Sequence, residues 1–275
     1  MPDSRETMQR IIEESGYPEL KEKFGTLNDE VRAILLSNLT EEVSEDQKQS
    51  IMNRVKSMVD DVESSLRNWL VTFVALSYLE GVNETRRRLD KSEADIMTLQ
   101  QDEEFSDHRE ATNNLVADAF ADYAGALDNV VRNTETMLNE SLMDKLERQM
   151  SEGMDAGLTN REIAENVVSE LEDRGFTALV DRGGNRWSLQ NYSDMLTRTH
   201  VIRTNTQGVI NTMFEFNYQL VEYSAHGAND IICGTKEGEI FSITGESDEY
   251  PHLENLTPSH PNCKHSLYPR PDLEA

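Results

Sequence analysis

The stretch that decides the fold of this chain runs from residue 195 to residue 267. It begins with Met195-Leu-Thr-Arg-Thr-His-Val-Ile-Arg-Thr-Asn-Thr-Gln207 and ends with Ser259-His-Pro-Asn-Cys-Lys-His-Ser-Leu267. Both cysteines and five of the 6 histidines of the chain lie within it. We therefore expect any special side-chain chemistry here, and we interpret the residues before it as scaffold.

The same stretch changes from a helical to a mixed pattern. Short β-prone runs occupy residues 219–224 and 239–243, as expected for strands. A helix is expected ahead of them, opening at Trp187 and ending near Glu215. Residues 176–275 are therefore predicted to form a small α+β domain.

Residues 1–175 are predicted to form a helical domain. Apolar side chains that recur every three and four residues predict two long helices, at residues 44–89 and 106–153, which pack on one another. Residues 90–105 show no such period and are interpreted as a connector. Arg86-Arg-Arg88 is interpreted as a solvated last turn, where positive charge suits the negative end of the helix dipole.

Local signals predict the other helix ends. Residues 5–40 are expected to form short helices that break at Gly16-Tyr-Pro18 and again near Gly25, because proline cannot continue a helix and glycine relaxes it. Thr159 and Glu162 have the spacing of a capping box. They predict the start of a helix that ends at Gly175.

The charge of the chain limits its partners. It has 52 acidic and 26 basic side chains, which argues against a broad nucleic-acid interface, because such an interface needs clustered lysine and arginine. Any contact with DNA would be local. The longest apolar run, Trp69–Leu79, falls well short of the about 20 residues of a membrane span. No membrane partner is expected, and without a signal-peptide pattern at its start the chain is expected in the cytoplasm.

A cluster of sulfur and imidazole ligands near the end of the chain suggests a metal. Residues 260–265 hold one cysteine and two histidines, and Cys233 with His226 or Asp230 could complete a tetrahedral zinc shell. The candidate ligands are Cys233, His260, Cys263 and His265. The alternative is a polar turn in which the histidines bond neighbouring carbonyls. Zinc is the one cofactor that the sequence leaves open.

Cys233 and Cys263 are the only cysteines, so we predict that their two segments meet in space. Three states are then open: a zinc site, a disulfide, or two thiols in a polar contact. Asp230 occupies the place where a Cys-x-x-Cys motif would have its first cysteine, and a carboxylate there makes a weaker metal site.

Glu237-Gly-Glu239 resembles the Glu-x-Glu element with which ADP-ribosyltransferases hold a ribose. Such a transferase also needs an arginine and a serine on strands, for which Arg203 and Ser242 are loose candidates. Glu237 and Glu239 are thus the catalytic candidates of the chain. The alternative is a turn that leads into the strand at Ile240.

Five ordered elements together resemble a known family, the phage minor capsid protein 2 and Mu F-like head morphogenesis group. They are Gly184–Tyr192, Met195–Thr199, Val221–His226, Cys233 with Gly238–Ile243, and His260–Leu267. The resemblance implies a minor head protein of a tailed virus, which binds the portal protein and the major capsid or scaffold protein. It also implies a place in the capsid interior of the virion, and in the host cytoplasm during assembly.

In this interpretation the protein is structural, and the long helices of residues 1–175 carry the contacts with the portal and the capsid. Glu237 and Glu239 are then a relic of a transferase-like fold. The residues expected to hold the C-terminal domain together are Arg198, Arg203, Cys233, His260, Cys263 and His265. The rival hypothesis is an enzyme, an ADP-ribosyltransferase-like or toxin-like effector delivered with the genome.

Overall fold

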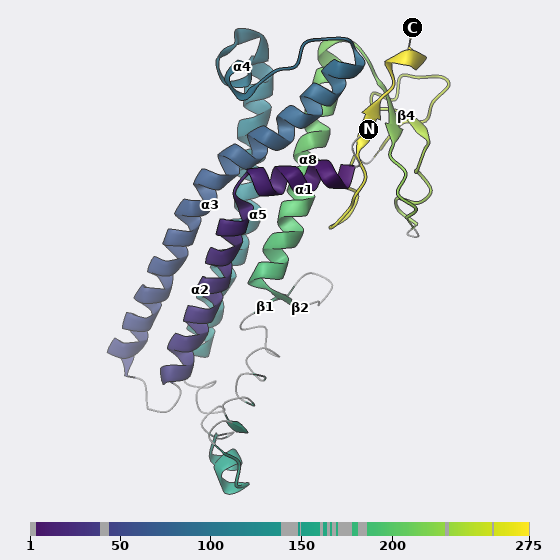
Figure 1. Cartoon of the computed structure of the whole chain (residues 1–275). Helices are drawn as coiled ribbons and strands as arrows, with labels where there is room; N and C mark the ends of the chain where they lie inside the picture. Colours follow the sequence, from purple (N-terminus) through teal and green to yellow (C-terminus); the bar gives the residue numbers. More distant parts are fainter. Residues whose placement is uncertain are drawn as a thin grey trace. The chain divides into compact units, whose positions relative to one another are not determined.

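The computed structural model describes most of the chain, with gaps. The described residues are 4–38, 44–138, 148, 150–159, 162–163, 166, 169, 178–180, 186–228, 231–254 and 256–274. Long helices dominate these residues, and a small antiparallel sheet lies near the C-terminus (Figure 1). The predicted α+β class is confirmed.

The described helices and strands follow one another in a simple order. The helices are α1 (Ser4–Glu14), α2 (Tyr17–Asn38), α3 (Glu45–Arg88), α4 (Ile96–Gln101), η1 (Glu103–Phe105), α5 (Ser106–Met137), α8 (Leu189–Glu215) and η2 (Pro271–Leu273). The strands are β1 (Ala178–Val180), β2 (Arg186–Ser188), β3 (Leu220–Tyr223), β4 (Ile240–Ser242) and β5 (Leu267–Pro269).

The long helices agree with the apolar periodicity. Figure 1 shows α3 as one uninterrupted helix, within a residue of the predicted range 44–89 at each end. The second predicted helix begins at Ser106 as expected and is described to Met137; residues 139–147 lie outside the described residues. Helix α8 ends at Glu215, as predicted, and begins two residues later than Trp187 because Trp187 belongs to β2.

The break expected near Gly25 is wrong, whereas the break at Gly16 is confirmed. Helix α1 ends at Glu14, and Gly16 adopts a left-handed φ of 80° before α2 begins. Helix α2 then runs on through Gly25. A Cβ at Gly25 would lie 2.3 Å from the side-chain nitrogen of Gln190, so this glycine serves a close packing contact and not a helix end.

The expected connector at residues 90–105 contains the helices α4 and η1. The Asp95 side chain caps α4 by accepting a hydrogen bond from the Thr98 amide at 2.7 Å. Leu99 and Phe105 are buried. These helices are too short to show an apolar period, which explains why the sequence pattern missed them.

The chain forms two compact units. The first comprises Met1–Pro18, Asn68–Phe120 and Met195–Ala275, and the second comprises Glu19–Arg67 and Ala121–Asp194. The predicted domain boundary at residue 175 lies outside the described residues. The division into residues 1–175 and 176–275 therefore stays a prediction.

The second unit is held by packing between α2 and the later part of α5. The rings of Phe24 and Tyr123 stack with their centroids 6.1 Å apart, and neither residue is exposed. Lys21 Nζ lies 2.6 Å from a carboxylate oxygen of Asp194. The capping box of this unit is confirmed, because the Thr159 amide donates to Glu162 at 2.8 Å and the Glu162 amide donates to the Thr159 hydroxyl at 3.3 Å.

In the first unit, α3 and α8 approach at glycines. A Cβ at Gly81 would lie 2.1 Å from the carbonyl oxygen of Asn205, and one at Gly208 would lie 2.3 Å from that of Tyr78. Real Cβ atoms do not come this close to backbone oxygen. Each glycine therefore allows a backbone-to-backbone contact that any other residue would prevent.

A buried chain of hydrogen bonds crosses the same interface. Asn211 donates to the Tyr78 hydroxyl at 2.7 Å, and that hydroxyl lies 2.8 Å from His108 Nδ1. His108 Nε2 lies 3.3 Å from Glu215. Because a carboxylate only accepts, Nε2 carries the proton and Nδ1 accepts from Tyr78. Burial raises the pKa of Tyr78 above its ordinary value, so the phenol remains a donor.

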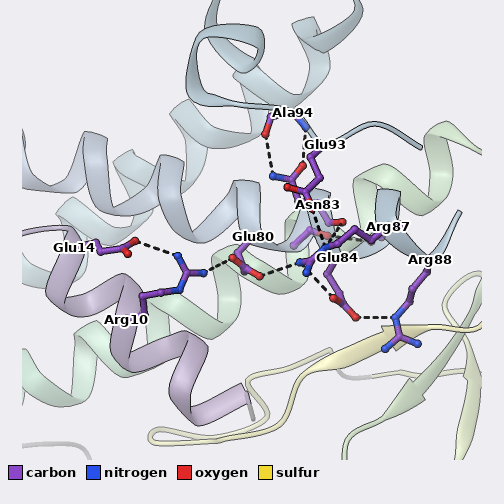
Figure 2. Close-up of polar contacts among 11 residues, drawn as sticks. Arg10, Glu14, Glu80, Asn83, Glu84, Arg87, Arg88, Glu93 and Ala94 are labelled. Atoms are coloured by element: carbon purple, nitrogen blue, oxygen red, sulfur yellow. Dashed lines mark hydrogen bonds and ion pairs between the residues drawn. The ribbon is translucent and has the colours of Figure 1, made fainter. Parts of the chain in front are cut away.

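The arginines at residues 86–88 form the predicted solvated turn only in part, because Arg87 is exposed whereas Arg86 and Arg88 are half-buried. Arg87 lies 3.2 Å from a carboxylate oxygen of Glu80 and 3.5 Å from one of Glu84 (Figure 2). Arg88 donates to Glu84 at 2.7 Å. These carboxylates lie on earlier turns of the same helix, so the end of α3 is paired internally.

The same network ties neighbouring segments of the first unit to α3. Arg10 of α1 lies 2.6 Å from Glu80 (Figure 2). The Asn83 side chain donates to the Ala94 carbonyl at 2.9 Å and accepts from the Ala94 amide at 2.8 Å. The charged end of α3 therefore binds both α1 and the segment before α4.

The sheet has the strand order β4-β3-β5, and both pairs are antiparallel. Side chains of α8 and β3 share one buried cluster with Cys233 and Cys263. Its members are Val209, Ile210, Met213, Val221, Tyr223, Cys233, Leu253, Cys263 and Leu267. Arg88 of α3 donates to the carbonyl of Pro269 in β5 at 3.2 Å, so β5 also contacts α3.

Across the described parts of the chain, every helix lacks the combination of length and apolar character needed to cross a membrane.

Candidate metal centre

Strand pairing brings together the two segments that carry cysteine. Tyr223 at the end of β3 pairs with Leu267 at the start of β5. The ladder extends one residue further, because the Ser224 amide donates to the Ser266 carbonyl at 3.0 Å and the Ser266 amide donates to the Ser224 hydroxyl at 2.9 Å. The segment before β5 is thereby placed against the loop that follows β3.

Cys233 and Cys263 lie side by side, as predicted. Their Sγ atoms are 3.9 Å apart, and both side chains are buried. The cysteines are free thiols. His265, 3% exposed, joins them with its Nδ1 atom 3.5 Å from the Cys263 sulfur. The ligand atoms of these three residues all lie within 4.8 Å of one another.

His260, the fourth ligand expected from the sequence, does not join this group. Its Nδ1 atom lies 2.9 Å from the carbonyl oxygen of Pro261. In the described part of the chain, Cys233, Cys263 and His265 make up the whole group of metal-ligand side chains. Asp230, which the sequence offered as a further ligand, lies outside the described residues.

The Glu237 carboxylate holds His265 in place. Glu237 Oε1 lies 2.7 Å from His265 Nε2. The same carboxylate accepts backbone hydrogen bonds from His226 at 2.8 Å, Gly227 at 3.0 Å and Ala228 at 3.0 Å. The hydrogen bond from His265, followed by the bonds from these amides, lowers the pKa of Glu237 to about 2, so it is ionised at neutral pH.

The contact with Glu237 decides which His265 nitrogen faces the sulfurs with a lone pair. An ionised carboxylate has no proton to donate, so His265 Nε2 carries the hydrogen of that bond. In the neutral ring Nδ1 is then the acceptor, and Nδ1 is the atom that faces Cys263. The imidazole is therefore oriented as a ligand that points to the thiol pair.

Tyr223 closes the other side of the group. Its hydroxyl donates to the Cys233 sulfur at 3.4 Å and lies 3.3 Å from the Ser259 hydroxyl. Burial raises the pKa of Tyr223 above its ordinary value, so the hydroxyl keeps its proton as a donor. A phenol that donates to sulfur favours the more negative state of that sulfur.

The other candidates from the sequence lie apart from this group. Arg198 Nε donates to the Asn262 side chain at 2.9 Å and so holds the turn before Cys263 to α8. Arg203 is an exposed residue of α8. Glu239 is exposed, and its backbone carbonyl accepts from the Tyr223 amide at 3.0 Å.

The candidate residues of a transferase-like site make other contacts in the structure. The Glu237 carboxylate accepts from His265 and from three backbone amides. The hydroxyl of Ser242 donates to the Gln219 side chain at 2.9 Å. The sequence reasoning missed the role of Glu237 and of Tyr223 at the thiol pair. The one available signal was the turn-forming run His226-Gly-Ala228, whose amides suit a carboxylate partner.

The fold and this site define a helical protein with a small C-terminal sheet and a buried cluster of two cysteines and one histidine. Comparison with known proteins shows its family. The family model "Phage minor capsid protein 2" matches residues 47–270. This match covers most of the chain, and the protein belongs to that family. It is therefore a minor capsid protein of a tailed phage, a component of the virion.

One curated relative is also a phage protein. A protein of Lactococcus phage LL-H, described as "Structural protein", is 26% identical over 104 residues. The alignment covers 34% of this chain and 28% of that protein, so the chain spans well under half the length of the relative. No solved structure matches the chain.

Proposed function

We propose that this minor capsid protein binds the portal protein on the inner face of the capsid during prohead assembly, and that it takes part in genome delivery. The family match across residues 47–270 carries the proposal, because it covers both the long helices and the C-terminal sheet. The major capsid or scaffold protein is the second partner. The strongly negative charge fits this role, since it keeps the protein from adhering to packaged DNA.

Exposed apolar side chains in the first unit suggest where a partner binds. Ile231 is 88% exposed and Ile232 is 53% exposed, next to the fully buried Cys233. Adjacent large apolar side chains that stay exposed to solvent are typical of protein interfaces. We therefore assign Ile231 and Ile232 to the contact with the portal.

Affinity capture of the chain with the portal protein of the same phage tests this proposal. The wild-type chain should retain the portal protein, and the double variant Ile231→Asp with Ile232→Asp should lose most of it. Met97→Asp is the matched control, because Met97 is 63% exposed on α4 of the same unit. Failure of the wild-type chain to retain the portal protein would refute the proposed partner. Equal loss in the control would refute the assigned surface.

The rival function, a transferase-like effector, receives less support from the site. The Glu237 carboxylate already accepts hydrogen bonds from an imidazole and three amides. A residue engaged in this way is poorly placed to hold a ribose as well. A transferase would lose activity on Glu239→Ala, whereas the proposed structural role predicts normal head assembly with that variant.

A further inference from the structure

The thiol pair with His265 has the spacing of a tetrahedral metal site. Zinc bonds sulfur at about 2.3 Å and imidazole nitrogen at about 2.0–2.1 Å. At the tetrahedral angle these lengths place two sulfurs about 3.8 Å apart, and a sulfur and a nitrogen about 3.6 Å apart. The observed separations are 3.9 Å for the two Sγ atoms and 3.5 Å for Cys263 Sγ to His265 Nδ1. The third distance, from Cys233 Sγ to the His265 nitrogen, is at most 4.8 Å, against about 3.6 Å in an ideal site. One ion can therefore bind Cys233, Cys263 and His265 once these two atoms approach by about 1 Å at most.

The same distances argue against the two other states of the cysteines. A disulfide needs the sulfurs about 2.05 Å apart, so closing one would require a rearrangement of a fully buried cluster. A plain thiol contact gives no role to the Glu237 carboxylate, which bonds His265 Nε2 at 2.7 Å and leaves Nδ1 facing Cys263. A metal accounts for both observations.

We propose that this site binds one zinc ion through Cys233, Cys263 and His265, with Glu237 as the residue that positions the imidazole. Zinc binding displaces the two thiol protons to solvent, and the resulting thiolates and the neutral ring are the ligands. The fourth position goes to solvent.

Each supporting contact has a definite role in this assignment. Glu237 bonds the imidazole nitrogen that does not face the metal, an arrangement common to zinc-bound histidines. Its three backbone amides anchor that carboxylate to the loop at residues 226–228. Tyr223 donates to the Cys233 sulfur and so stabilises the thiolate form. His260 takes no part, because its Nδ1 atom lies against the Pro261 carbonyl.

The ion would join the loop after β3 to the segment before β5. In the described structure these two segments are connected by strand pairing and by the buried cluster of apolar side chains. Ligands 30 residues apart in sequence would then be fixed to one centre, so zinc removal should loosen this end of the sheet. Zinc binding by the chain does not depend on the portal contact.

The test uses the full chain, purified without a histidine tag and under reducing conditions. Elemental analysis should find about one zinc per chain. Replacement by Co²⁺ should give the visible bands of a tetrahedral cobalt thiolate, and competition with a chelator gives the affinity. A wild-type chain that holds no zinc after reconstitution, or gives no cobalt thiolate spectrum, would overturn the proposal whatever the variants do.

Matched variants test the ligand set. Cys263→Ser and His265→Ala should abolish stoichiometric zinc binding, whereas His260→Ala, a histidine of the same segment, should keep it. Equal loss in His260→Ala would overturn the assigned ligands. Glu237→Gln should weaken zinc affinity by about 10–100-fold while the cobalt spectrum stays tetrahedral. An unchanged affinity would remove Glu237 from the site.

Discussion

Gly208 of α8 lies directly against the carbonyl oxygen of Tyr78 in α3, and a Cβ there would come within 2.3 Å of that oxygen. Gly81 makes the reciprocal contact with Asn205 at 2.1 Å. The two helices therefore touch through their backbones at this point. The crossing carries the buried hydrogen bonds of Tyr78 and lies in the unit that holds the sheet.

Alanine at either glycine should destabilise the protein. Gly81→Ala and Gly208→Ala each force the helices apart, and overpacking of this kind costs about 1–3 kcal/mol. Gly125→Ala is the control, because no atom lies within 4 Å of its Cβ position on α5. That change should stabilise the protein by about 0.5–1 kcal/mol, through helix propensity alone. Urea unfolding measures all three, and a neutral Gly208→Ala would contradict the described crossing.

Removal of the Tyr78 hydroxyl should destabilise the protein, because the buried chain of hydrogen bonds would be broken. Tyr78→Phe leaves the Asn211 amide and His108 Nδ1 without their shared partner. Unsatisfied buried groups cost about 1–3 kcal/mol. Thermal unfolding should show the lower stability of Tyr78→Phe. The control Tyr250→Phe, which alters a phenol in the surface loop at residues 244–250, should leave the stability unchanged. A Tyr78→Phe protein as stable as wild type would show that this chain of bonds contributes little.

The cap of α4 should depend on pH. Backbone and side-chain hydrogen bonds from Thr98 lower the pKa of Asp95 below its ordinary value of 3.8. A lowered pKa means that the contribution is fully present above pH 3.8 and is lost as the pH falls toward the folded-state value. The protection of the Thr98 and Leu99 amides against exchange, relative to the unfolded chain at the same pH, should therefore fall in acid. Asp95→Asn should keep the cap without this pH dependence, and an identical acid response in that variant would disprove the role of the carboxylate.

The isolated protein should not assemble by itself in dilute buffer. Its formal net charge is -26, and like charges of this size oppose self-association when salt does not screen them. Light scattering at low salt should give the mass of a single chain, with larger particles only after the portal protein is added. A stable ring formed by the purified chain alone would contradict this expectation.

Sequence pattern predicted the long helices well because their signal is repeated many times. The apolar stripe of α3 recurs along its whole length, so both ends fell within a residue of Glu45 and Arg88. Short elements lack this repetition. β5 spans only Leu267–Pro269 and includes a proline, and nothing in its composition marks a strand. The uninterrupted α2 was missed because Gly25 serves a side-chain contact that the sequence does not reveal.

The site was predictable where the residue types are rare. With two cysteines in the chain, both within the family pattern, their adjacency could be inferred, and it is confirmed. Acidic residues number 52, so sequence alone could not single out the one carboxylate that bonds His265. The spacing of Glu237 and Glu239 indicates a transferase-like motif because it involves only neighbours in sequence. The hydrogen-bond partners of Glu237 instead come from two separate loops.

If this chain works in the head of a tailed phage by binding the portal, as proposed, cross-linking of purified proheads should join the two proteins. Proheads of the phage that encodes the chain would be treated with a carboxylate–amine cross-linker, which suits its abundant acidic side chains, and the linked peptides would be identified by mass spectrometry. The chain should be present in proheads and linked to the portal protein, with links near residues 231–239. Absence of the chain from proheads, or links to tail proteins without any to the portal, would contradict the proposed portal contact.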